Sequence, residues 1–142
     1  MLQYLKLISL SIITIISPLA MWAYEHYPES IGERARYEMM IEMPKAYASG
    51  ILIIARVGES TIDASWVNEF GLSLLDFSYD EKKNKVKLHH VMKKLDKWYI
   101  KRVLKADLKK VMSMMMNHEC TEFYNTKYKI KYIVNSLNEV VE

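Results

Sequence analysis

The hydrophobic and polar residues follow two different periods along the chain, and their order predicts the secondary structure. Five segments read as strands, and they span residues 37–43, 49–57, 61–67, 72–79 and 86–92. Four of them alternate apolar and polar residues, which is typical of a strand with one buried face. The segment 49–57 is apolar on both faces and indicates a central strand. Short turns separate the five, so the sequence predicts a meander of antiparallel hairpins.

The period changes to 3.6 residues near residue 97, which predicts a helix over residues 97–117. Asp96 stands before it and is a good N-cap residue, because its carboxylate can accept the free N–H groups of the first turn. The apolar stripe of this helix consists of Ile100, Val103, Leu104, Leu108, Val111, Met112 and Met115. Residues 128–134 then alternate with lysines and predict a last strand at an edge of the sheet, where lysines discourage unwanted pairing.

The element order is therefore β-β-β-β-β-α-β. We expect an α+β fold in which a curved antiparallel sheet of about six strands, a half-open barrel, carries one long amphipathic helix on its concave face. Residues 24–136 form the single expected domain, and residues 137–142 form a tail.

The N-terminal residues carry the longest continuous apolar run, residues 7–16, directly after Lys6. A run of about ten residues is short of the roughly 20 that a membrane-spanning helix needs. A short positive region followed by such a run is the pattern of a signal peptide, with Ala20 and Ala23 as candidate cleavage positions. We expect residues 1–23 to be a signal peptide or an uncleaved anchor, and the rest of the chain to lie in the periplasm or cell envelope.

Charge, cysteine count and histidine positions argue against nucleic-acid binding, an internal disulfide and a metal site. The net charge of +3 is too small to indicate nucleic-acid binding, and the single cysteine, Cys120, cannot form an internal disulfide. His89 and His90 are adjacent on a predicted strand and point to opposite faces. His118, Glu119 and Cys120 stand in a row, but no second pair of ligands accompanies them as in zinc sites. We expect no metal, no cofactor and no catalytic residue.

A small hydrolase is the least favoured alternative. Cys120 with His118 or His89 is a conceivable nucleophile and base, but the chain has no Gly-x-Ser-x-Gly elbow or comparable motif.

The segment from Ser49 to Leu108 carries a family resemblance. It reads SGILII, then VNEFG, then LDFSYD, then KVKLHHVMKKLDKWYIKRVLKADL, with Asp96-Lys97 before the helix. This order resembles an uncharacterised family of exported Bacteroidota proteins, which is similar in strand order to the lipoprotein-localisation carriers of the LolA/LolB type. The resemblance implies an unclosed antiparallel barrel that is covered by helices and holds acyl chains.

These observations together predict a non-enzymatic envelope protein that holds a lipid or lipidated chain in an apolar cleft between sheet and helix. The expected lining is Ile51, Ile53, Trp66, Leu75, Phe77, Leu104, Leu108 and Met112, and the expected rim is Trp98, Tyr99, Lys101 and Arg102. The rim cations would attract an anionic head group or a membrane surface. The alternative is an envelope protein–protein interaction module with a filled core. A large hollow between sheet and helix favours carriage, and tight packing there favours docking.

Overall fold

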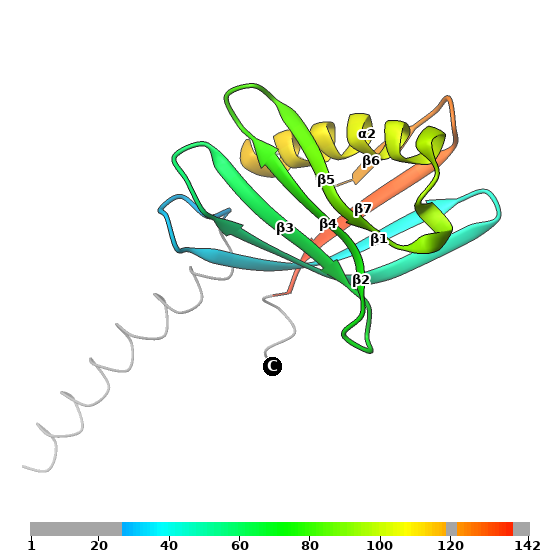
Figure 1. The fold of residues 1–142 in the computed structure, drawn as a ribbon, viewed down its shortest axis with the longest axis horizontal. Coiled ribbons are helices and arrows are strands. Elements are labelled where there is room, and N and C mark those ends of the chain that lie inside the picture. The colour runs from blue at the N-terminus through cyan, green and yellow to red at the C-terminus, as the bar shows by residue number, and fades with distance from the viewer. Residues whose placement is uncertain (1–26, 119–121, 138–142) are drawn as a thin grey trace, which may run out of the picture.

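The computed structural model describes residues 27–118 and 122–137 (Figure 1). The strands in this part of the chain are β1 (Arg34–Met43), β2 (Ala46–Arg56), β3 (Thr61–Val67), β4 (Ser73–Asp80), β5 (Lys85–Val91), β6 (Glu122–Asn125) and β7 (Ile130–Ser136). The helices are the short 3₁₀-helix η1 (Lys93–Leu95) and the α-helix α2 (Trp98–Met116). The expected signal segment, Cys120 and residues 138–142 of the expected tail lie outside the described residues.

The strands form one antiparallel sheet in the order β5-β4-β3-β2-β1-β7-β6. The sheet curls into a half-barrel, and α2 lies along its open side (Figure 1). The strands that approach α2 most closely are β5 and β6, which are the two edges of the sheet. The helix therefore covers the gap that the curled sheet leaves between its edges. The predicted α+β fold, a curved antiparallel sheet with one amphipathic helix, is confirmed.

The core lies between the concave face of the sheet and α2. On β2, Leu52 and Ile54 are fully buried, whereas Ile51 and Ile53 alternate with them and are only partly buried. This alternation shows that the core takes every second residue of a strand that is apolar throughout. The same alternation recurs on β1, β3, β4 and β7, and the buried residues of all these strands join those of α2 in one cluster.

Three neighbouring strands are locked together by Trp66. Its indole Nε1 donates a hydrogen bond of 3.2 Å to the carbonyl oxygen of Met39, two strands away on β1. Gly50 of β2 lies opposite Met39 in the ladder. A Cβ atom at Gly50 would lie 2.2 Å from the carbonyl oxygen of Val67 and 3.1 Å from Trp66 Nε1. The absence of a side chain at Gly50 is thus what lets the indole reach β1.

The C-terminal part of the sheet differs from the prediction. The structure has seven strands among the described residues instead of about six, because β6 was not expected. The prediction that the last strand lies at an edge is wrong, since β7 pairs with both β1 and β6. Tyr128, which we expected in that strand, belongs to the turn between β6 and β7 and is 48 % exposed. The lysine pattern marks a turn and the outer face of β7.

The start of the helix also differs. The N-cap residue is Lys97, and its side chain makes no capping hydrogen bond. Asp96 follows η1, and its Oδ1 lies 3.0 Å from Lys101 Nζ. The expectation that Asp96 caps α2 is therefore wrong, because η1 takes up the residues before the helix and moves the start of α2 one position further on.

Candidate functional site

Most of the residues expected to line a cleft belong to the packed core, and one of them, Leu104, also borders a pocket. Six of the eight belong to the packed core and are between 0 and 3 % exposed: Trp66, Leu75, Phe77, Leu104, Leu108 and Met112. The two others, Ile51 and Ile53, alternate with the buried residues of β2 and face away from the helix. The prediction that Ile51 and Ile53 line a cleft is therefore corrected. Periodicity alone could not show which face of a strand that is apolar on both sides points inward.

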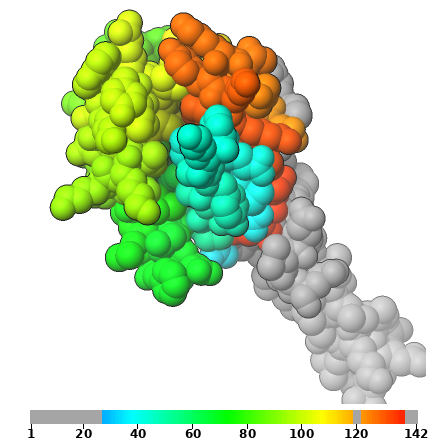
Figure 2. Space-filling view, turned by 90° about the vertical axis from the view of Figure 1, so that its right-hand side faces the viewer, coloured from blue at the N-terminus to red at the C-terminus, as the bar shows by residue number. Residues whose placement is uncertain are grey.

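An apolar pocket instead opens at one end of the half-barrel, and we call it the end pocket. Its volume is about 280 Å³. Its lining consists of Ile41, Met43, Pro44, Leu95, Tyr99, Ile100, Val103, Leu104, Tyr128 and Ile130. Figure 2 shows this end of the molecule, where the β1–β2 turn meets η1 with the start of α2 and the β6–β7 turn. None of the lining residues carries a charge.

The end pocket contains few of the residues that the sequence suggested. Leu104 of the expected lining and Tyr99 of the expected rim both belong to it. The other contributors come from the ends of β1 and β7, from turns, from η1 and from α2, where Ile100 and Val103 belong to the predicted apolar stripe. Only the curl of the sheet brings the strand ends and turns against the helix, so no local pattern predicts that these segments form one pocket.

The expected rim divides between two sides of α2. Trp98, Lys101 and Arg102 line a groove of about 730 Å³ between β5 and α2, which we call the β5–α2 groove. Trp98 and Tyr99 are 72 % and 50 % exposed, and their rings meet edge to face with centroids 5.8 Å apart. Two exposed aromatic rings thus stand at the helix start, between the two openings.

A third pocket, of about 490 Å³, lies on the other side of α2, against β6 and the β6–β7 turn. Asp107 is one of its lining residues and is only 3 % exposed. Asn125 Nδ2 donates to its two carboxylate oxygens at 2.9 and 3.0 Å, and Tyr132 Oη donates to Oδ2 at 2.7 Å. Burial and the hydrogen bond to Asp107 together raise the pKa of Tyr132 well above its usual value. This polar cluster ties α2 to both β6 and β7.

Ser78, His89 and Asp63 lie together on the outer face of the sheet and contain the three residue types of a catalytic triad. Ser78 Oγ lies 2.6 Å from His89 Nε2 and donates to Asp63 Oδ1 at 2.8 Å. A catalytic serine gives its proton to the histidine, and the carboxylate holds the other ring nitrogen. Here the carboxylate holds the serine itself. The arrangement satisfies polar groups on an exposed surface and does not activate a nucleophile.

The remaining candidate chemistry is limited. No group of three or more histidine, cysteine, aspartate or glutamate side chains within residues 27–118 and 122–137 is placed to hold a metal ion. His118 is exposed at the end of α2, and its expected companion Cys120 lies outside the described part of the chain.

Residues 27–118 and 122–137 contain no helix that is long and apolar enough to cross a membrane. A scan against protein-family models found no matching model, and searches of curated proteins and of solved structures found no match either.

Proposed function

We propose that the chain is a non-enzymatic binding protein of the cell envelope, and that it holds one acyl chain of a lipid or lipidated molecule in the end pocket. The observation that carries this proposal is an uncharged, apolar opening at the end of a half-barrel whose core is packed. Small-molecule sites are concave and mostly apolar, with volumes of about 300–1,000 Å³. The end pocket, at about 280 Å³, is just below that range and suits a single chain segment.

Burial of apolar surface would supply the affinity, at roughly 25 cal/mol for each Å² removed from water. The half-barrel interior is filled by residues such as Trp66 and Leu108, which are 0 % exposed. An acyl chain therefore enters at the end of the barrel and does not run along the length of α2. Tyr99 and Tyr128, both about half exposed and both lining the pocket, form its edge toward solvent.

Displacement of cis-parinaric acid, a fluorescent fatty acid, tests the proposal with the full chain. Val103 lines the end pocket and is only partly buried, so Val103→Trp fills the space without opening the core. Val57 is 51 % exposed and lies after β2, outside the pocket lining, so Val57→Trp is the matched control. We expect wild type and Val57→Trp to bind the probe equally, and Val103→Trp to bind at least tenfold more weakly. Equal binding by all three proteins would contradict the proposal.

A protein–protein interaction module is the second candidate function. It is favoured by the filled core and by the exposed aromatic rings at the helix start, of which Trp98 is the most exposed. Aromatic side chains are enriched where interfaces form. Absence of any fatty-acid binding, together with a partner that co-purifies with wild type and is lost in Trp98→Ala, would favour this second function.

A further inference from the structure

The β5–α2 groove is strongly one-sided in charge. Eleven residues line it, and none of them is a carboxylate. Six are cations: Lys85, Lys87, Lys101, Arg102, Lys105 and Lys109. A concave surface lined by one sign of charge focuses the electrostatic field and concentrates ligands of the opposite sign.

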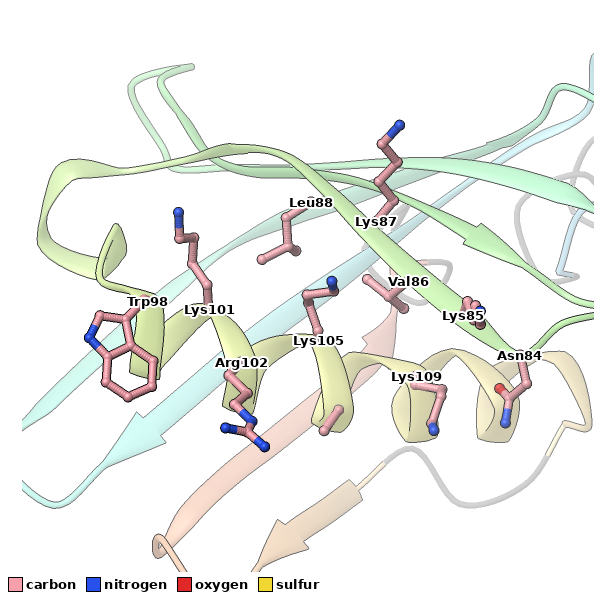
Figure 3. Close-up of a pocket in the computed structure, with 11 residues that line it drawn as sticks. Asn84, Lys85, Val86, Lys87, Leu88, Trp98, Lys101, Arg102, Lys105 and Lys109 are labelled. Carbon is pink, nitrogen blue, oxygen red and sulfur yellow. The ribbon is translucent and has the colours of Figure 1, made fainter.

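The groove has an apolar floor and a basic wall. Figure 3 shows Val86 and Leu88 pointing from β5 toward the helix, while Lys101 and Lys105 extend from α2 toward β5. Trp98 stands at one end. The three helix lysines Lys101, Lys105 and Lys109 recur at every fourth position. They form a row on one side of α2, with a step of about 6 Å along the axis.

Among the described residues, Lys101 is the member of this row that has an ion-pair partner. Lys101 lies 3.0 Å from Asp96, but both side chains are about half exposed, so the pair is open to an incoming anion. Lys105 makes no ion pair with any residue that the structure describes. Like charges four residues apart on a helix destabilise it. A ligand that carries negative charge would relieve this repulsion.

We propose that the β5–α2 groove binds an anionic ligand carrying two or more phosphate groups in a row, held chiefly by Lys101 and Lys105. Lysine binds phosphate as a point charge with three donors, so each of these two side chains can hold one phosphate group. A repeated step of about 6 Å matches several charges spread along one ligand better than a single ion. The groove shares no lining residue with the end pocket, so this site is independent of acyl binding.

Phosphate chemistry can come from two sources, a lipid head group or a soluble phosphate chain. Inorganic tripolyphosphate, titrated by calorimetry, tests the soluble source. Co-sedimentation with phosphatidylcholine vesicles, with and without cardiolipin, a lipid that carries two phosphate groups, tests the lipid source. Binding to the mixed vesicles but not to tripolyphosphate would assign the lipid head group, and binding to tripolyphosphate would show that phosphate alone suffices.

The variant Lys101→Gln/Lys105→Gln removes two charges from the groove. Its matched control is Lys45→Gln/Lys129→Gln, because both of these lysines are exposed in turns and line none of the three pockets. We expect the groove variant to bind at least tenfold more weakly than the control, and the difference to shrink at high salt. Lys105→Glu, a single exposed substitution, provides a second variant should the double variant unfold.

Each result decides the question. Equal binding by the groove variant and the control would overturn the proposal, as would the failure of wild type to bind either probe. The groove variant should still bind cis-parinaric acid, and Val103→Trp should still bind tripolyphosphate. Failure of the anionic site can therefore be told apart from failure of the acyl site.

Discussion

Tyr132 Oη donates a 2.7 Å hydrogen bond to Asp107 Oδ2, and this bond joins β7 to the inner side of α2. Both residues are almost fully buried, at 0 % and 3 % exposure. Asn125 of β6 donates to the same carboxylate. The helix that borders all three pockets is thus held to the C-terminal strands by a polar cluster inside the protein.

Removal of the Tyr132 hydroxyl should weaken this connection. A hydrogen bond to a charged group contributes about 1.5–3 kcal/mol. We expect Tyr132→Phe to lower the free energy of unfolding by about 2 kcal/mol, measured by urea denaturation. Asp107→Ala should cost more, because it leaves the Tyr132 hydroxyl and the Asn125 amide without their partner. Tyr47, which is 66 % exposed, gives the control Tyr47→Phe. A Tyr132→Phe variant as stable as this control would contradict the prediction.

Buried tyrosines should make the fold sensitive to alkali. Burial raises the pKa of Tyr37 to about 12, and burial also raises the pKa of Tyr79 and of Tyr132. A raised pKa in the folded state means that the folded protein keeps the proton while the unfolded chain releases it near pH 10. The stabilisation is complete below pH 10 and is lost as the pH rises toward 12.

The free energy of unfolding should therefore fall between pH 10 and pH 12, by about 1.4 kcal/mol per pH unit for each such tyrosine. Urea denaturation of wild type and Tyr37→Phe across this interval measures the fall. We expect a shallower fall in Tyr37→Phe, because one of the contributing groups is gone. Tyr47→Phe is again the control and should follow wild type. Parallel curves for wild type and Tyr37→Phe would show that Tyr37 contributes nothing to the alkaline transition.

Gly50→Ala should be strongly destabilising. The new Cβ would lie 2.2 Å from the carbonyl oxygen of Val67, a backbone atom that cannot move without shifting β3. Overpacking of this kind costs about 1–3 kcal/mol. The substitution should also lengthen the bond from Trp66 to Met39, which intrinsic fluorescence can follow. Gly58→Ala is the control, because its Cβ would meet only Thr61, at an ordinary 3.5 Å. Equal stability of the two variants would contradict this account of Gly50.

Buried positions can be predicted from the sequence wherever an element has one apolar and one polar face. The inward position of Trp66 and that of Leu108 follow from the alternation of β3 and from the apolar stripe of α2. Strand β6 could not be predicted in this way, since it is only four residues long and alternates between partly buried and exposed positions. Ile53 shows the opposite case, where apolar residues on both faces hide which one is inside.

The candidate sites were less predictable, for a related reason. Residues of the end pocket, such as Met43 and Ile130, are distant in sequence and meet only when the sheet curls. Asp107 could have been found, because it is an acid within the apolar stripe, directly before Leu108. A charged residue at a core position predicts a polar partner inside the protein.

Arg56 holds the other end of the molecule together. Its side chain is 8 % exposed and forms a two-pronged ion pair with Glu81, with distances of 2.9 and 2.8 Å. Arg56 Nε also donates to the carbonyl oxygen of Pro28 at 3.0 Å, and Nη1 donates to that of Glu59 at 2.8 Å. The guanidinium thus connects the residues before β1 with the β2–β3 and β4–β5 turns.

Loss of one member of this pair should therefore cost more than loss of both. Removal of one partner of a buried ion pair leaves an uncompensated charge and costs about 3–5 kcal/mol, whereas an apolar replacement of both partners is often close to neutral. We expect Arg56→Met to lower the free energy of unfolding by about 3 kcal/mol, and Arg56→Met/Glu81→Met to recover part of that loss. Urea denaturation of wild type, both single variants and the double variant gives the coupling. Strictly additive effects would mean that the backbone contacts of Arg56, and not Glu81, carry its contribution.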